Sequence, residues 1–199
     1  MGLDSELVEG QTPLDEEEKD GLLIPTITTR GELDEFEQQN IERAIQWTMR
    51  RKFKKDELLT ETFIKLVHKK MYGDVWAWAG EFRKTNKNIG VDRHQVAIEL
   101  RKLIDDCKYW IDHGTYPPDE TAVRFKHRIV QIHCFSNGNG RHSRLMGDLI
   151  IEKIFNQPVF TWGSQGDLTK TGKEREQYLS AIKAADAKNI IDLLEFARK

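Results

Sequence analysis

Apolar residues recur every three or four positions along most of this chain, and that spacing is typical of one face of an α-helix. One apolar stripe runs from Leu33 to Thr48 and a second from Leu59 to Met71, with Asp56 as the expected N-cap of the second. Further stripes lie over 96–111, 118–132, 141–155 and 178–196. The pattern predicts an all-α fold, a bundle of about six to eight helices.

Residues 76–92 break this periodicity with two glycines, two asparagines and apolar residues that alternate with polar ones. Glycine and asparagine favour tight turns, and alternation is the pattern of a strand. We therefore predict a short β-hairpin flap in this segment. The flap is expected to consist of Lys84, Thr85, Asn86, Lys87, Asn88, Ile89, Gly90 and Val91.

The charge balance argues against partners that bind by net charge. The 199 residues include 31 basic and 33 acidic side chains, a net charge of −2, so nothing attracts the chain as a whole to nucleic acid or to a membrane surface. No apolar run approaches the roughly 18 residues of a membrane helix. Cys107 and Cys134 do not make a disulfide framework. We expect a soluble cytoplasmic protein with neither a membrane partner nor a nucleic-acid partner.

Residues 1–28 differ from the rest of the chain. Between Asp4 and Asp20 there are eight acidic residues and one lysine. Such a segment is typical of an arm that packs on a main body rather than forming its own core. We therefore divide the chain into an acidic N-terminal arm, 1–28, and one globular domain, 29–199.

The segment richest in functional chemistry is 133–144, with the sequence HCFSNGNGRHSR, between two helical patterns. Glycines at the N-terminus of a helix let the backbone approach a ligand closely, and the N–H groups there bind anions. Arg141 and Arg144 lie beside that terminus, and guanidinium groups suit phosphate oxygens. His133 ends the preceding helix, where it could take a proton from a hydroxyl. The alternative is a tight helix–helix turn whose arginines pair with the acidic arm.

The same string resembles the signature of Fic-domain proteins, His-x-Phe-x-(Asp/Glu)-Gly-Asn-Gly-Arg-x-x-Arg, with Asn137 at the acidic position. Residues 78–83 resemble the Fic segment before the target-docking hairpin, and 178–186 resemble its C-terminal helix. The similarity covers about 30–198, so that 29–199 would be a Fic domain in a Fic-type helical bundle. The opening and the string NGNGRHSRLM look most like the group called mobile mystery protein B.

The resemblance implies a protein adenylyltransferase, which moves AMP from ATP to a Ser, Thr or Tyr hydroxyl of a target protein. His133 would be the general base, and the flap would align the target by strand addition. Phosphate binding would fall to Gly138, Asn139, Gly140, Arg141 and Arg144, with Arg141 at the β-phosphate and Arg144 at the γ-phosphate.

Asn137 departs from the family pattern, in which an acidic residue binds Mg²⁺. An amide oxygen can ligate Mg²⁺, but it is neutral and holds a hard cation less well. Three outcomes stay open: ATP with Mg²⁺ and Asn137 as a weak ligand, another nucleotide or phosphodiester donor, or a catalytically weak nucleotide-binding or partner-binding module.

The acidic arm also contains a short pattern that restrains many Fic proteins, (Ser/Thr)-x-x-x-Glu-(Gly/Asn), here as Ser5, Glu9 and Gly10. A carboxylate paired with Arg144 would occupy the γ-phosphate position and repel a triphosphate. The alternative is a solvated arm, with restraint supplied by a separate antitoxin-like or regulatory partner. A homo-oligomer is left open.

Overall fold

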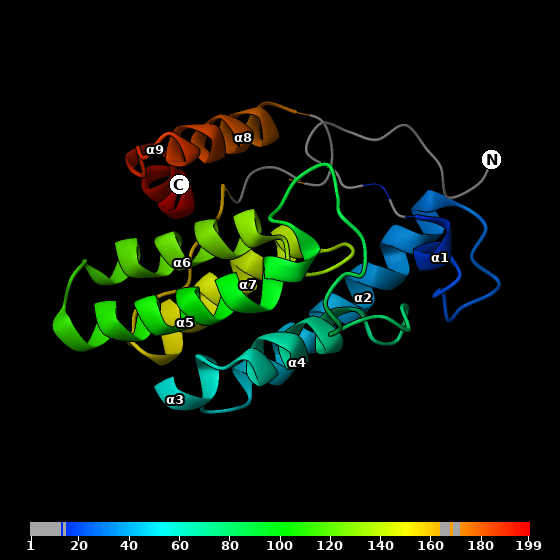
Figure 1. Ribbon diagram of the computed structural model, residues 1–199, viewed down its shortest axis with the longest axis horizontal. Helices are drawn as coiled ribbons and strands as arrows, with labels where there is room; N and C mark the ends of the chain where they lie inside the picture. The colour runs from blue at the N-terminus through cyan, green and yellow to red at the C-terminus, as the bar shows by residue number, and fades with distance from the viewer. Residues whose placement is uncertain (1–12, 14, 164–167, 169–171) are drawn as a thin grey trace.

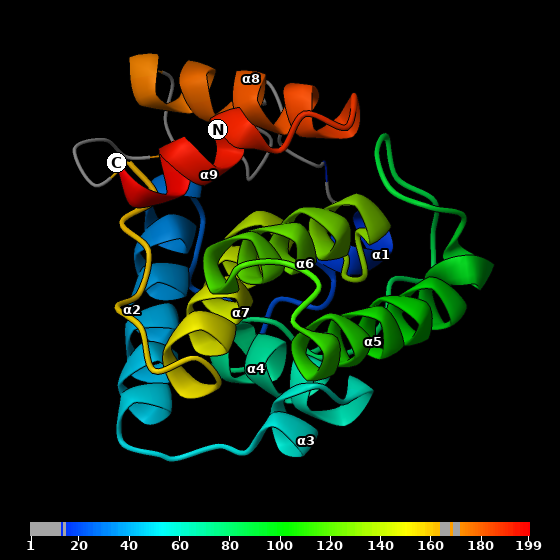
Figure 2. The same ribbon diagram turned by 90° about the vertical axis from the view of Figure 1, so that its left-hand side faces the viewer.

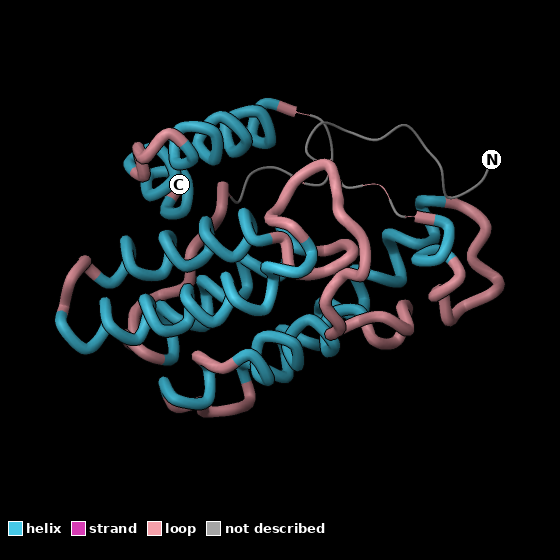
Figure 3. Tube along the Cα trace, viewed as in Figure 1, coloured by secondary structure: helices cyan, strands magenta, loops and turns pink. Residues whose placement is uncertain are grey.

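The structure is a computed structural model that describes residues 13, 15–163, 168 and 172–199. Within these ranges the chain forms nine α-helices and no strand (Figure 3). This confirms the predicted all-α fold; α1 and α3 are single turns, too short to show an apolar stripe. The helices are α1 (Glu16–Lys19), α2 (Arg30–Met49), α3 (Lys55–Leu58), α4 (Glu61–Tyr72), α5 (Val96–His113), α6 (Pro118–Ile132), α7 (Asn139–Lys153), α8 (Lys173–Asp186) and α9 (Ile191–Arg198), and a 3₁₀ turn at Arg93–Gln95 precedes α5.

Helices α6 and α7 form the centre of the bundle, and the short connection between them carries the glycine-rich string (Figure 1). Helix α5 packs along α6, α4 lies against α7 and α2, and the α8–α9 pair covers α6 from the other side (Figure 2). Fully buried apolar side chains fill these contacts: Leu33, Ile64, Val67, Leu100, Phe125, Ile132, Ile150 and Leu193. The core therefore fixes the end of α6 and the start of α7.

The helix ends follow capping chemistry. Thr29 begins α2 with a capping box, since its side chain accepts from the N–H of Glu32 and the Glu32 carboxylate accepts from the N–H of Thr29. Thr60 begins α4, where its hydroxyl accepts from the N–H of Phe63 at 3.1 Å. The prediction that Asp56 caps this helix is wrong, because Asp56 lies inside the single turn of α3.

The predicted flap, residues 84–91, is a loop rather than a β-hairpin in the described part of the chain. Figure 2 shows it extending beyond the N-terminal end of α5. The reason lies in the buried Arg83, whose guanidinium donates to the carbonyl of Thr85 at 2.8 Å and to the carbonyl of Val91. A side chain thus takes the acceptors that strand pairing would use, so no ladder forms.

Only part of the acidic arm is described. Leu22 forms an isolated bridge with Trp76, and the N–H of Leu23 donates to the carbonyl of Val75 at 2.8 Å. The arm is thereby fastened to the turn that follows α4. None of the helices described here is both long and apolar enough to cross a membrane.

Candidate active site

The site is built on the signature loop, residues 133–138, which joins α6 to α7. His133 ends α6 in the left-handed region, with φ of 58°, and Gly138 precedes α7 with φ of 76°. A Cβ on Gly138 would lie 2.5 Å from the ring of Tyr72, so a side chain there would be both strained and obstructed. The loop can turn this tightly because position 138 is glycine.

Asn139 holds the loop closed. Its Oδ1 accepts from the N–H of Phe135 at 2.9 Å, and its Nδ2 donates to the carbonyl of Phe135 at 2.8 Å. Phe135 is itself fully buried. The side chain of Asn139 therefore serves the loop, which leaves its backbone N–H, in the first turn of α7, for the predicted phosphate contact.

His68 of α4 supports the loop from beneath, and sequence reasoning had given it no role. Its Nδ1 accepts from the N–H of Gly80 at 3.0 Å, so the proton is on Nε2, which donates to the carbonyl of Asn137 at 3.0 Å. Its ring stacks on Phe135, with centroids 3.8 Å apart. The sequence did contain a signal for this role, because a histidine on the apolar face of a predicted helix must find hydrogen-bond partners in the core.

The flap and His133 lie against each other. The side chain of Arg83 donates through Nε to the carbonyl of His133 at 2.6 Å, and the backbone N–H of Arg83 donates to the carbonyl of Cys134 at 3.0 Å. Gly90 has φ of 109°, and a Cβ there would lie 2.6 Å from the Cβ of His133. Arg83, just before the flap, and Gly90, near its end, therefore both lie against His133, the residue expected to act as the general base.

Two carboxylates of the arm, Asp15 and Glu18, bind side chains of the flap. We call this pair the carboxylate clamp. The ammonium of Lys87, on a side chain only 1 % exposed, lies 3.0 Å from Asp15 and 2.5 Å from Glu18. The hydroxyl of Thr85 donates to Asp15 at 2.6 Å. Because 85 and 87 are two residues apart, they present one side of the extended chain to the arm.

Burial sets the protonation state of His133. Burial, together with the charges of Arg83 and Lys87, lowers the pKa of this imidazole from 6.5 to about 4. The ring is therefore neutral at pH 7 and able to accept a proton. The neighbouring Cys134 is unsuited to nucleophilic chemistry, because burial raises the pKa of its thiol to about 12.

The two arginines of the string have different surroundings. Arg141 pairs with Glu37 of α2 at 2.7 Å, and Glu37 also accepts from the indole N–H of Trp76 at 2.7 Å. The guanidinium of Arg144 lies 5.6 Å from the ring centroid of Tyr178 in α8. The described ion-pair partner of Arg141 is thus in α2.

Space is open at the start of α7. A Cβ on Gly140 would meet nothing within 4 Å, in contrast to Gly138. Beside this space lie the first N–H groups of a helix, which have no intrahelical partner, and they favour an anion. The geometry therefore combines a neutral imidazole, an open helix N-terminus and two arginines in the first two turns of that helix.

The residues offer little to a metal ion. No group of three or more His, Cys, Asp or Glu side chains suited to a metal occurs among the described residues. The Oδ1 of Asn137 accepts from the N–H of Gly138 at 2.6 Å, so this amide is already engaged with the backbone. Asn137 alone does not fit as a resident Mg²⁺ site.

Comparison with known proteins agrees with this geometry. A profile described as the Fic/DOC family matches residues 58–151, which include α4, the flap, α5, α6, the signature loop and most of α7. The chain carries a Fic domain. The long string at 133–144 is thus part of a match that extends well beyond it.

Curated relatives of this Fic domain are named protein adenylyltransferase Fic. The protein from Aedes aegypti is 28 % identical over 109 residues, which are 53 % of this chain and 22 % of the relative. The protein from Nematostella vectensis is 25 % identical over 131 residues, which are 64 % of this chain and 31 % of the relative. The match thus spans about a quarter of the length of these relatives.

Solved structures share the fold. A fragment of Fic-1 from C. elegans has a TM-score of 0.66 at 20 % identity and covers 90 % of this chain and 51 % of its own. BepC from Bartonella tribocorum, solved with bound AMPPNP, has a TM-score of 0.66 at 16 % identity and covers 92 % of this chain and 98 % of its own. The helical arrangement described above is that of Fic structures.

Some predicted site residues lie outside the structural account. These are Ser5, Glu9 and Gly10, which are outside the described residues.

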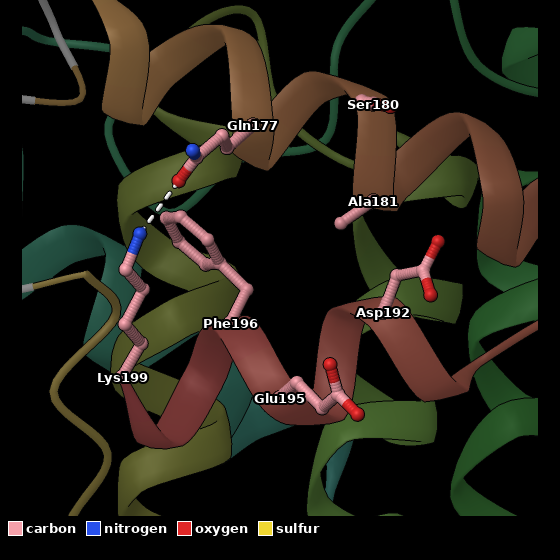
Figure 4. Close-up of a pocket in the computed structure, with 7 residues that line it drawn as sticks. All are labelled: Gln177, Ser180, Ala181, Asp192, Glu195, Phe196 and Lys199. Carbon is pink, nitrogen blue, oxygen red and sulfur yellow. Dashed lines mark hydrogen bonds between the residues drawn. The ribbon is translucent and has the colours of Figure 1, made fainter.

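A shallow pocket lies between α8 and α9. It is lined by Gln177, Ser180, Ala181, Asp192, Glu195, Phe196 and Lys199 (Figure 4). None of the predicted site residues lines it, and we assign it no part in the chemistry.

Proposed function

We propose that this Fic domain transfers AMP from ATP to a Ser, Thr or Tyr hydroxyl of a target protein. The observation that carries the proposal is the buried, neutral His133 beside the open N-terminus of α7. A base and an anion-binding helix end, side by side, suit attack by a hydroxyl on a phosphate. The names of the curated relatives support the same activity.

In this reaction the target hydroxyl loses its proton to the imidazole of His133, and its oxygen attacks the α-phosphorus of ATP. A new oxygen–phosphorus bond forms, the bond to the bridging oxygen of the β-phosphate breaks, and pyrophosphate leaves. Negative charge that develops on the phosphates would be stabilised by the first N–H groups of α7, at Asn139 and Gly140, and Gly138 would let the backbone turn closely around them. Arg141 and Arg144 would contact the β- and γ-phosphates.

The flap would present the target. Its backbone beyond the contacts of Arg83 is exposed, at residues 88–90, and an extended target segment could pair with it. Because Gly90 lies on His133, a hydroxyl on that segment would be delivered to the base.

We assign Mg²⁺ to the triphosphate rather than to a protein site, since the amide oxygen of Asn137 already accepts from the N–H of Gly138. Bound in this way, the cation would neutralise phosphate charge. Changing Asn137→Asp should raise Mg²⁺-dependent transfer, because a carboxylate holds a hard cation more strongly than an amide does. Unchanged transfer would contradict this account of position 137.

We further propose that Glu9 restrains the enzyme by pairing with Arg144 in place of the γ-phosphate. Glu9→Gly should then raise self-modification, because the competing carboxylate is gone. Unchanged transfer in Glu9→Gly would favour restraint by a separate antitoxin-like partner.

The experiment uses nucleotides labelled at the α-phosphorus: ATP beside UTP, GTP and CTP, with Mg²⁺. Label is followed into the protein itself and into a bacterial lysate, for wild type, Glu9→Gly and His133→Ala. Transfer from ATP that disappears in His133→Ala supports the proposal. Preferential transfer from another nucleotide points to a different donor on the same scaffold. No label from any nucleotide in any variant points to a nucleotide-binding or partner-binding module.

A further inference from the structure

A lysine is buried behind the arginine expected at the γ-phosphate. Lys126 of α6 has no exposed surface, and its ammonium donates to the hydroxyl of Tyr178 in α8 at 2.5 Å. Nothing in the transfer reaction described above uses it. An ammonium group is expensive to bury, so a lysine at such a position calls for an explanation.

Aromatic rings rather than carboxylates surround this ammonium. Its Nζ lies 4.5 Å from the ring centroid of Tyr178 and 5.7 Å from that of Trp162. In the described part of the chain, no carboxylate oxygen lies within 4.0 Å of it. Ring faces and a hydroxyl stabilise a cation without cancelling its charge, whereas an ion pair would cancel it.

The lysine side chain can reach this position because α6 and α7 approach closely. A Cβ on Gly147 of α7 would lie 3.4 Å from the Cβ of Lys126. Burial lowers the pKa of Lys126, and the contact with Tyr178 opposes that shift. The hydroxyl of Tyr178 is thus the main polar partner of a lysine enclosed by two helices and a tryptophan.

Tyr178 connects this lysine to Arg144. The guanidinium of Arg144 lies 5.6 Å from the centroid of the Tyr178 ring. Burial raises the pKa of this phenol, but the positive charges of Lys126 and Arg144 outweigh burial and lower it. Two cations, Lys126 from α6 and Arg144 from α7, therefore lie against one phenol, the first on its hydroxyl and the second on its ring. The ring of Tyr178 thus supports the arginine, its hydroxyl holds the lysine, and the positive charge of the lysine adds to that of the arginine.

We propose that Lys126 and Tyr178 are positioning residues for Arg144, and that the three together form a cationic site selective for the third phosphate of a nucleoside triphosphate. This inference rests on the proposed function, because it takes Arg144 as the γ-phosphate contact. It explains why an apolar residue of similar volume does not occupy position 126, although such a residue is often neutral or stabilising when it replaces a buried charge.

The test measures the affinity of ATP, ADP, AMP and inorganic triphosphate by calorimetry. Tyr178→Phe keeps the ring and removes the hydroxyl that accepts from Lys126, while Lys126→Met keeps most of the volume and removes the charge. Arg128→Met is the matched control, because it removes a cation from the same helix, one that pairs with Glu99 at 2.6 Å. Each variant is also made in Glu9→Gly, so that an arm carboxylate cannot compete.

We expect Lys126→Met and Tyr178→Phe each to weaken ATP and inorganic triphosphate about tenfold, and to change AMP less than about twofold. The double variant should be no weaker than the weaker single variant, since both act through one arginine. Arg128→Met should bind all four ligands as wild type does. Thermal unfolding checks that each variant is folded. If Lys126→Met does not fold, Tyr178→Phe still tests the inference.

Equal weakening of ATP and AMP, or unchanged ATP affinity in a folded Tyr178→Phe, would overturn the inference. If wild type binds inorganic triphosphate but no nucleotide, the proposed function fails, and loss of triphosphate affinity in the variants still supports the cationic site. If wild type binds neither, both proposals are overturned.

Discussion

The signature loop and the flap lie against each other at His133, yet they are held by different interactions. The loop is closed by buried neutral hydrogen bonds, from Asn139 to Phe135 and from His68 to Asn137. The flap is held by charged groups, above all Lys87 in the carboxylate clamp. Buried neutral hydrogen bonds depend little on salt, whereas ion pairs near the surface respond to salt and to pH. The part expected to meet the nucleotide is therefore fixed, and the part expected to meet the target can be released.

The largest effect should come from Asn139→Ala. The change leaves the N–H and carbonyl of Phe135 buried without partners, and we expect a loss of roughly 2–6 kcal/mol in the free energy of unfolding, with transfer abolished. The matched change in the flap is Asn86→Ala, which removes exposed contacts to Asp92 and Arg93 and should lose less than about 1 kcal/mol. Urea denaturation measures both. Equal losses would erase the contrast between the two regions.

The next largest effect should come from acidification, which should affect the buried histidines at a higher pH than it affects the clamp. Burial lowers the pKa of His133 and of His142 from 6.5 to about 4, so only the unfolded chain takes up protons between these values. Their stabilisation is complete above pH 6.5 and is lost as pH falls toward 4, by roughly 2 kcal/mol for each histidine at pH 5. The free energy of unfolding, measured from pH 7.5 to 4.5, reports this loss.

The clamp should respond in a lower window. Hydrogen bonds from Thr85 and Lys87 lower the pKa of Asp15 below 3.8, so its contribution is complete above that value and is lost as pH falls below it. Hydrogen exchange of the flap amides should therefore stay slow at pH 5, where the histidines already destabilise the fold. Release of the flap in step with global unfolding above pH 5 would contradict this order.

Lys87→Met tests the clamp directly. It leaves the largely buried Glu18 without its cation, and we expect opening of the flap to become easier by about 1.5–3 kcal/mol, seen as faster amide exchange over 84–91. Exchange in α6 and α7 should not change. The control is Lys84→Met, at an exposed lysine of the same flap. Equal acceleration in both variants would show that the clamp has no special part.

The smallest effect should be that of salt. Raising NaCl from 0.1 to 1 M shortens the screening length from about 10 to about 3 Å. The contact of Lys87 with the half-exposed Asp15 should then weaken by less than about 1 kcal/mol, while the hydrogen bonds of the signature loop keep their protection. Amide exchange at the two salt concentrations measures the difference.

The local features of the fold could be predicted from the sequence. Helical stripes, the end of α5 at Gly114 and the start of α6 at Pro118 follow from rules that involve neighbouring residues. The proximity of His133 to the first turn of α7 could be predicted as well, because the two are separated by only a few residues of the signature string. Residues close in sequence have few ways to be far apart.

Contacts between distant segments were not predictable in this way. Glu37 meets Arg141, and Arg83 meets His133, across 104 and 50 positions of the chain. The hairpin prediction failed because it counted backbone propensity and did not foresee a buried guanidinium among the flap carbonyls. Patterns of periodicity describe one element at a time, and a side chain from another element can change the outcome.

The carboxylate clamp lies in the same N-terminal arm as the proposed restraint at Glu9, so one segment bears on both ends of the reaction. Binding equilibria that share a contact are linked in both directions by the same factor. A molecule that captures α1 away from Lys87 must also loosen the target surface. Conversely, a target that prefers the clamped flap must hold the arm in place. The binding of a target protein and the binding of a regulator to the arm would thus be coupled through α1.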